Sequence, residues 1–332
     1  MKAMIYRKAH PVAEFALAIE DLPEPTLRDS DVMVEIRAIG INPGEAFIRG
    51  QRSAERGGYV LLGWEFSGVI VGLGPKAVGR FEIGDRVFGT GDMTRDGAWA
   101  DRLAVDHRIV AKIPEHLSFV DAASLPIGAI TAWEAMFREG DSLPEGVDRV
   151  LILGGAGGVG SLATQLLKAR TQAFVISTGS RAESRDWCTK MGADLVIDHG
   201  GDIVDQLARA DITEVDMVFS TAKTSESIGW IAKVLRPFGH LSFVDAASQI
   251  NIGALMSKSI TLHAEMVFSR ILYGRAPSLH GEILKTIARW ADERRIRSIV
   301  ATQLHGLSPA AMRRAHEVLE TGRTIGKIVI LF

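Results

Sequence analysis

The chain has 332 residues and a formal net charge of −2, with 47% hydrophobic and 23% charged residues. This length and composition allow two domains of ordinary size with large apolar cores. The near-neutral balance, without a basic run, excludes a general attraction to nucleic acid or to anionic membranes.

The ends and the cysteine content indicate a cytoplasmic protein. Residues 1–25 lack the continuous apolar segment and small-residue cleavage site of a signal peptide. No run of about eighteen apolar residues could span a bilayer. Cys188 is the single cysteine, so a disulfide within the chain and any zinc site that needs two cysteines are excluded. We interpret Cys188 as a small hydrophobic residue packed on a helix.

The first 120 or so residues are predicted to be rich in β-strands. Short apolar or alternating runs are separated by Gly, Pro and Asp, which is typical of a barrel or sandwich. These runs lie at 1–6, 31–40, 66–74, 85–91 and 102–114. Helical spacing follows over 119–140.

From residue 149 the pattern changes to strands that alternate with helices. Short β-prone runs lie at 150–153, 174–177, 195–197, 217–220 and 241–244. Segments with apolar residues at helical intervals separate them, at 161–170, 184–192, 202–210 and 225–239. Repeated strand–helix units predict a doubly wound parallel sheet, and therefore an α/β protein. The last residues are predicted as helices over 281–295 and 309–322 and a strand over 327–332.

A glycine-rich turn is the strongest functional motif. The apolar run Val150–Leu153 leads directly into the GAGGVG segment and then into a helix. Gly155 is expected to permit the tight turn, Gly157 to let the backbone approach a diphosphate, and Gly160 to let the helix pack on the strand. Free N–H groups at the helix start then face the phosphates. The predicted cofactor-binding residues of this turn are Gly155, Ala156, Gly157, Gly158, Val159 and Gly160.

The end of the second strand favours NADPH over NADH. An NAD enzyme usually has Asp or Glu there, to accept hydrogen bonds from the ribose. This chain has Ser180 and Arg181 instead, with no carboxylate before Glu183. A hydroxyl and a guanidinium suit a 2′-phosphate. The alternative is that both residues only cap and solvate the next helix.

Motifs along most of the chain resemble the medium-chain dehydrogenase/reductase superfamily, in its quinone-oxidoreductase and zinc-type alcohol dehydrogenase-like branch. Besides the glycine turn, the motifs lie at 41–50, 61–74, 84–87, 124–137, 263–274 and 322–330. The resemblance implies an N-terminal GroES-like β-barrel domain over 1–122, a Rossmann NADP-binding domain over 123–263, and a return to the catalytic domain over 264–332. It also implies a homodimer made by pairing the edge strands of the Rossmann domains.

The chain departs from the zinc-using relatives at their metal ligands. Asn42 stands where they have a Cys, and Trp64 stands where they have the His of a Gly-His-Glu triplet. A catalytic zinc needs three protein ligands and an open position, so Glu65 alone is not enough. We therefore predict no metal site. The resemblance further implies that Glu65 pairs with an arginine inside the protein.

Loss of the metal restricts the plausible substrates. A simple ketone forms a localised alkoxide, which zinc would stabilise. A quinone or an α,β-unsaturated carbonyl spreads the charge, so positioning and one or two hydrogen-bond donors suffice.

Four residues are the catalytic candidates. Asn42 could donate to the substrate or orient the cofactor, or could be only a turn residue before Pro43. Tyr59 could donate as a phenol or only line the pocket, and Trp64 could form an apolar wall. Arg270, like Arg49, could pair with a carbonyl or phosphate or be held in a surface salt bridge; the resemblance places Arg270 and Phe268 near the nicotinamide. No residue qualifies as a general acid.

The resemblance also implies further cofactor contacts. They are Thr131 near the nicotinamide, Ser220 and Thr221 at the ribose, Phe243 and Val244 at the carboxamide, and Lys327 at the phosphates. The chain is thus predicted to be a zinc-independent NADPH-dependent oxidoreductase acting on quinones or α,β-unsaturated carbonyls, with no nucleic-acid or membrane partner. The alternatives are an enoyl-thioester or alkenal reductase, and a non-catalytic NADPH-binding protein of the crystallin-like kind.

Overall fold

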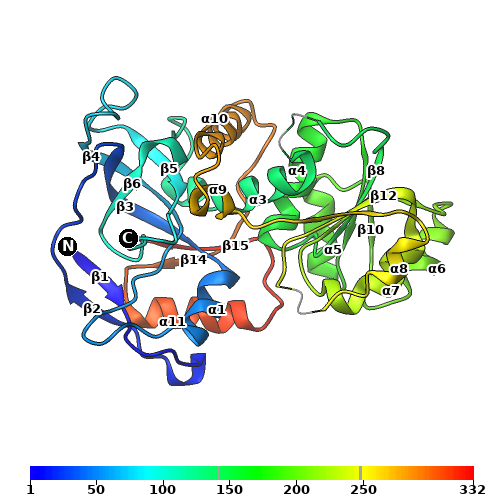
Figure 1. Ribbon diagram of the computed structural model, residues 1–332, viewed down its shortest axis with the longest axis horizontal. Helices are drawn as coiled ribbons and strands as arrows, with labels where there is room; N and C mark the ends of the chain where they lie inside the picture. The colour runs from blue at the N-terminus through cyan, green and yellow to red at the C-terminus, as the bar shows by residue number, and fades with distance from the viewer. Residues whose placement is uncertain (139, 141, 247–248) are drawn as a thin grey trace. The chain divides into compact units, whose positions relative to one another are not determined.

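The computed structural model describes residues 1–138, 140, 142–246 and 249–332 (Figure 1). The chain divides into two compact units, the first formed by residues 1–127 and 268–332 and the second by residues 128–267. The predicted boundaries, after residues 122 and 263, lie five and four residues before these divisions.

A seven-stranded sheet and a two-stranded hairpin form the β-rich first unit. One edge of strand β3 pairs with β6 along Asp31–Glu35 and with β15 along Ala38–Ile41, while β4 pairs along the other edge. Strand β3 therefore pairs with three other strands of the sheet. The strands are β1 (Lys2–Ile5), β2 (Ala18–Asp21), β3 (Asp31–Ile41), β4 (Glu65–Leu73), β5 (Arg86–Thr90), β6 (Arg102–Asp106), β7 (Val110–Lys112), β14 (Val300–His305) and β15 (Lys327–Leu331).

Helices cover the sheet of this unit. The short helix α1 (Pro43–Gln51) was not predicted, because it lies within a segment dominated by strand patterns. Its start is well specified: Asn42 is the N-cap, and Pro43 follows at the first helical position. The others are η1 (Val12–Glu14), η2 (His107–Ile109), α2 (Phe119–Ala122), α9 (Ser269–Leu272), α10 (Ser278–Asp292) and α11 (Pro309–Glu320).

The second unit contains a six-stranded parallel sheet in the order β10-β9-β8-β11-β12-β13. Numbered from β8, this order is 3-2-1-4-5-6, the order of a dinucleotide-binding sheet. The predicted doubly wound sheet is confirmed. The strands are β8 (Arg149–Leu153), β9 (Phe174–Thr178), β10 (Leu195–Ile197), β11 (Val215–Ser220), β12 (Leu235–Phe243) and β13 (Thr261–Ala264).

The helices of the second unit lie beside its parallel sheet, and several of them contact one another (Figure 1). The helix α4 contacts α5, whereas α7 contacts α6 and α8. Apolar side chains of the strands and of α6, α7 and α8 form one buried core cluster. The helices are α3 (Pro126–Phe137), which begins just before the unit boundary, α4 (Gly158–Arg170), α5 (Ala182–Met191), α6 (Ile203–Arg209), α7 (Thr224–Val234) and α8 (Gly253–Met256). None of the helices in the described ranges has the length and apolarity to cross a bilayer.

An aromatic and basic cluster lies in the core of the first unit. The ring of His316 packs edge-on against Phe15 and Trp99, and His316 is fully buried. Burial, together with the smaller effects of the charges of Arg49 and His10, lowers the pKa of His316 from 6.5 to about 3. His316 is therefore neutral in the folded protein at ordinary pH.

Acid should destabilise the protein through His316. Its folded-state pKa lies below the value of 6.5 expected in the unfolded chain, so the unfolded chain binds more protons between about pH 6.5 and pH 3. Stability contributed by the neutral ring is present above pH 6.5 and is lost as the pH falls. Between pH 7 and pH 4, the free energy of unfolding of the wild type should fall by up to about 3 kcal/mol more than that of His316→Phe. Urea unfolding across this range tests the prediction, and parallel curves for the two proteins would contradict it.

Candidate functional site

The glycine turn joins the end of β8 to the start of α4 in the second unit. The first N–H groups of a helix have no acceptor within the helix, and the N-cap Gly157 has no side chain to provide one. A side chain at Gly157 would meet its nearest atom, the Gly154 carbonyl oxygen, only at 3.5 Å. The turn therefore has room for a group outside it, at the positive end of the helix dipole.

The structure corrects the role expected of Gly155 and explains Gly160. The tight turn uses Gly154, whose φ is +81°, and not Gly155. Gly155 is instead required because a side chain there would meet the Ser177 Cβ at 2.7 Å. A side chain at Gly160 would meet the Gly154 carbonyl oxygen, and the Gly155 Cα at 2.7 Å. Gly160 thus allows the close helix–strand packing that the motif requires.

Basic groups gather beyond the ends of β9 and β10. Ser180 is exposed, and the partly exposed Arg181 is the N-cap of α5. Burial lowers the pKa of His199, and the charges of Lys223 and Arg181 lower it further, while Asp198 opposes them. Arg181 and Lys223 therefore lie close enough to His199 to act on it electrostatically.

Sequence reasoning missed Lys223 and His199. Lys223 is exposed, and its φ of +56° lies in the left-handed region that lysine rarely adopts. It precedes α7, far along the chain from Arg181, so only the parallel order of the sheet brings the two together. The unusual backbone conformation marks a position where function and local strain often coincide.

The ends of β11 and β12 carry a hydroxyl and carboxylate network. The Thr224 hydroxyl donates to Asp245 and shares a second hydrogen bond of 2.7 Å with the Ser220 hydroxyl. The Thr221 hydroxyl donates to the Leu153 carbonyl at 2.8 Å. Ser220 and Thr221 therefore lie at the carboxyl edge of the sheet, as expected, but the hydroxyl proton of Thr221 is already used within the protein.

The backbone groups expected to meet a carboxamide are partly engaged. The Val244 N–H donates to the Ser220 carbonyl at 3.2 Å, and the Phe243 carbonyl accepts from the Glu265 N–H at 2.9 Å. The Val244 N–H is therefore used within the protein, whereas the Phe243 carbonyl keeps a second lone pair that can accept a hydrogen bond. Thr131 is almost buried on α3, in the same unit.

In the first unit a buried polar network surrounds Asn42. Lys327 donates from Nζ to Asn42 Oδ1 at 2.6 Å and forms an ion pair with Glu65. Asn42 Nδ2 donates to Glu65 Oε2 at 3.2 Å, and the Ile127 N–H donates to Glu65 Oε1 at 2.8 Å. The side chains of Glu65 and Lys327 are 0% and 7% exposed.

This network bears on the expectations for Glu65, Lys327 and Asn42. The partner of Glu65 is Lys327, not an arginine. The ammonium of Lys327 is buried between Glu65 and Asn42, which occupy two of its three N–H groups, and its contact with cofactor phosphates stays a prediction. The amide of Asn42 accepts from Lys327 at its oxygen, and its nitrogen donates to Glu65 at 3.2 Å and to the Gly40 carbonyl at 3.5 Å, so in this arrangement it positions neighbouring groups.

Glu45 is a buried carboxyl that sequence reasoning missed. Its oxygens accept from the backbone N–H groups of Asn42 at 2.9 Å and of Trp64 at 2.8 Å. Burial raises its pKa to about 7, although these N–H groups and the Lys327 ammonium act in the opposite direction. The spacing of Asn42 and Glu45, an N-cap and the third helical residue, is the signal of a capping box that could have revealed it.

Tyr59, Trp64 and the arginines take separate positions in this unit. Tyr59 is 36% exposed and donates from its hydroxyl to Asp96 Oδ2 at 2.9 Å. Burial, and next this hydrogen bond, raise the pKa of the Tyr59 phenol. Trp64 packs edge-on against Phe268 with 5.3 Å between ring centres, and both side chains are buried. Arg270 lies on α9, two residues after the N-cap Phe268, and is partly buried. The side chain of Arg49 is 2% exposed and forms an ion pair with Glu320, so it is not held in a surface salt bridge.

The residues at the ligand position of the zinc-using relatives do not suit a metal ion. The indole of Trp64 packs on Phe268, and the amide of Asn42 and both oxygens of Glu65 are held by internal donors. A divalent cation here would also lie beside the ammonium of Lys327. Across the described ranges, no group of three or more His, Cys, Asp or Glu side chains could hold a metal.

The fold and these sites define a two-domain oxidoreductase of the dehydrogenase type. Residues 28–115 match the alcohol dehydrogenase GroES-like domain, and residues 191–330 match the zinc-binding dehydrogenase domain. A zinc-type alcohol dehydrogenase-like protein of Staphylococcus aureus is 34% identical over 338 residues, which cover 99% of each chain.

Solved structures are also similar to this chain over its whole length. A Rhizobium etli protein, provisionally described as a zinc-dependent alcohol dehydrogenase, is 34% identical with a TM-score of 0.96 over 100% of this chain and 98% of its own. The quinone oxidoreductase of Coxiella burnetii is 27% identical with a TM-score of 0.82, over 100% and 99%. The chain belongs to the medium-chain dehydrogenase/reductase superfamily, together with the zinc-type alcohol dehydrogenase-like proteins. The resemblance noted in the sequence is confirmed.

Proposed function

We propose that this oxidoreductase is a zinc-independent reductase that uses NADPH to reduce quinones or α,β-unsaturated carbonyls. The observation that carries the proposal is the buried group of Asn42, Glu65 and Lys327, which fills the ligand position with an internal ion pair instead of a metal. The similarity to a quinone oxidoreductase over the whole chain supports the substrate class.

The second unit would bind the cofactor across the carboxyl edge of its parallel sheet. The glycine turn would receive the diphosphate, and Ser180, Arg181 and Lys223 would receive the 2′-phosphate. NADPH, when bound, supplies a hydride. Thr131 and the backbone at the ends of β11 and β12 would orient the nicotinamide, which is the positioning that hydride transfer requires.

The first unit would supply the surroundings of the acceptor. Trp64 and Phe268 offer an apolar wall suited to a flat conjugated ring. Because the Asn42 amide is engaged and the Tyr59 hydroxyl already donates to Asp96, neither is a ready proton donor. An acceptor that delocalises the added charge suits these surroundings, and solvent would supply the proton.

A spectrophotometric assay tests this proposal. The protein, dialysed against a chelator and checked for metal content, is mixed with NADPH and 9,10-phenanthrenequinone, and NADPH oxidation is followed. We expect turnover with quinones and enones and none with simple alcohols. Cofactor binding without turnover on any conjugated acceptor would favour a non-catalytic NADPH-binding protein. Activity that depends on restored zinc would refute the proposal.

Cofactor preference should depend on Arg181 and Lys223. We expect Arg181→Gln combined with Lys223→Asn to raise the KM for NADPH by about tenfold or more, because charge-assisted hydrogen bonds to phosphate are lost. Asparagine tolerates the left-handed backbone at position 223. The KM for NADH should be almost unchanged. Lys233→Ala, a change of an exposed lysine on α7, is the matched control. Equal changes for both cofactors would refute the 2′-phosphate assignment.

We also propose a cytoplasmic homodimer formed through strand β13. This strand is the edge of the parallel sheet, and its Thr261, Leu262 and Ala264 are exposed. Unpaired edge strands are surfaces on which another strand can add. Light scattering of the purified protein should give twice the mass of one chain, and a monomer at all concentrations would refute the proposal.

A further inference from the structure

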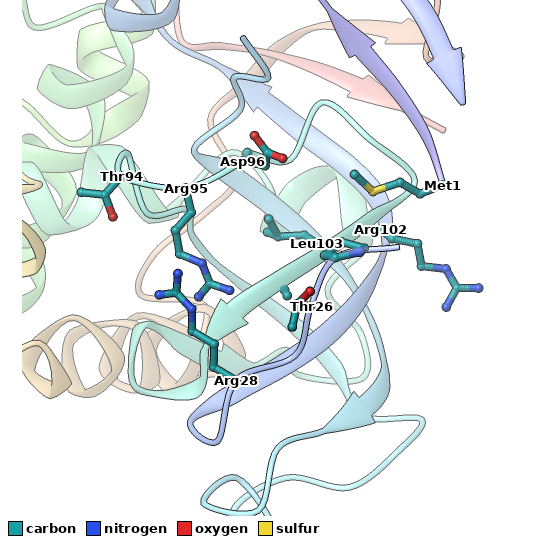
Figure 2. A pocket seen from close by; sticks show the side chains of 11 residues that line it. Met1, Thr26, Arg28, Thr94, Arg95, Asp96, Arg102 and Leu103 are labelled. Carbon is teal, nitrogen blue, oxygen red and sulfur yellow. The ribbon is translucent and has the colours of Figure 1, made fainter. Parts of the chain in front are cut away.

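A pocket in the first unit lies away from the polar network around Asn42. It has a volume of about 270 Å³ and is formed by the segment before β3, the loop between β5 and β6, and the start of β6 (Figure 2). Among its lining residues are Thr26, Arg28, Thr94, Arg95, Asp96 and Arg102. Three guanidinium groups thus line it against one carboxylate.

Arg28 and Arg95 form the cationic end of the pocket. Figure 2 shows their side chains pointing toward one another. Both are tied to Asp31: the Arg28 backbone N–H donates to Asp31 Oδ2 at 3.0 Å, and the Arg95 guanidinium donates to both carboxylate oxygens at 3.0 and 2.7 Å. The bidentate pair fixes Arg95, whose side chain is 13% exposed, beside the nearly buried Asp31. Arg95 therefore does not have to be ordered by a ligand.

The charge of Arg28 is not neutralised within the protein. Its side chain is exposed, and across the described part of the chain no carboxylate lies within ion-pairing distance of it. Among the carboxylates of the neighbouring segments, Asp106 is paired with Arg108, whereas Asp96 and Asp92 accept from the neutral hydroxyls of Tyr59 and Thr94. The guanidinium of Arg95 thus pairs with Asp31, whereas that of Arg28 has no carboxylate partner among the described residues, so the charge of Arg28 remains available to an anion.

We propose that this pocket binds a small oxyanion, such as a phosphate group, between Arg28 and Arg95. A planar guanidinium recognises the oxygens of phosphate with two parallel hydrogen bonds. The hydroxyl of Thr26, labelled in the same pocket, adds a possible donor (Figure 2). Arg102 belongs to the rim: its side chain points away from the other two in Figure 2, and its Nη2 lies 3.9 Å from Glu35 Oε2.

Calorimetric titration of the full-length protein with inorganic phosphate tests the proposal. We expect saturable binding that Arg28→Gln weakens by about tenfold, as for loss of one charge-assisted hydrogen bond. Arg28 is chosen because truncating Arg95 would leave Asp31 buried without its partner. Arg102→Gln removes one positive charge from the same pocket and should leave the affinity within about twofold.

The cofactor site requires a separate control, because it also offers basic groups to phosphate. The variant carrying Arg181→Gln and Lys223→Asn should keep the pocket's phosphate binding, whether or not the proposed cofactor assignment holds. Three results would overturn the proposal: no saturable binding, binding unchanged by Arg28→Gln, or binding lost only in the cofactor-site variant. Equal competition by chloride would also overturn it, since it would indicate an adventitious ion only.

Discussion

Gly160→Ala is expected to weaken NADPH binding by about a hundredfold. The new methyl group would meet the Gly154 carbonyl oxygen, and the Gly155 Cα at 2.7 Å, both of which are backbone atoms of the phosphate-binding turn. Neither can rotate away as a side chain would, so the turn and the start of α4 must move apart. The N–H groups that should face the diphosphate then lose their common direction. Fluorescence titration with NADPH measures the effect.

Gly229→Ala is the matched control for this prediction. Gly229 lies on α7 of the same unit, and a side chain there would meet nothing within 4 Å. Alanine favours a helix over glycine, so this change should raise stability by about 0.5–1 kcal/mol and leave cofactor affinity unchanged. Circular dichroism establishes that both variants are folded. A folded Gly160→Ala protein with wild-type affinity would contradict the role given to the turn.

Lys327→Met is expected to lower the free energy of unfolding by about 3–5 kcal/mol. Methionine resembles lysine in length but removes the ammonium that pairs with Glu65 and donates to Asn42 at 2.6 Å. The carboxylate of Glu65 is then left in a fully buried position with only neutral donors. Urea unfolding at neutral pH gives the change directly.

The double variant distinguishes the buried charge from a simple packing defect. Combining Lys327→Met with Glu65→Gln removes both charges, so most of the lost stability should return. Lys285→Met breaks the exposed pair with Glu282 and should cost less than about 1 kcal/mol. If the double variant were as unstable as the sum of its single changes, the ion pair would not be the cause.

The second unit was predictable because its local patterns repeat. Each β-prone run from Val150 onward is followed by apolar residues at helical intervals, and the sheet uses these runs in the expected parallel arrangement. Helix α1 and strand β14 escaped prediction. Nine residues of helix within a strand-rich segment give too few turns for a periodic signal, and β14 alternates between exposed and half-buried positions without strong apolar character.

The candidate sites were predictable only where sequence neighbours form them. The glycine turn and the Ser180–Arg181 pair are contiguous motifs, so their place in the fold followed from the strand they end. The partners of Asn42 and Glu65 come from β15, near the far end of the chain, and Lys223 reaches Arg181's surroundings from another strand–helix unit. The hydrogen-bond partners of the Asn42 amide come from such distant segments, so the sequence alone could not show that this amide is already engaged.

The ordering of the two units along the chain has a consequence for synthesis. The second unit is one uninterrupted stretch, whereas the first is assembled from both termini and closes around β15. A ribosome therefore releases every residue of the parallel sheet before it makes Lys327. Until then Glu65 lacks its counter-charge, and the N-terminal part of the first unit lacks the strand that pairs with this edge of β3. Its exposure to chaperones and proteases would last until the final strand emerges.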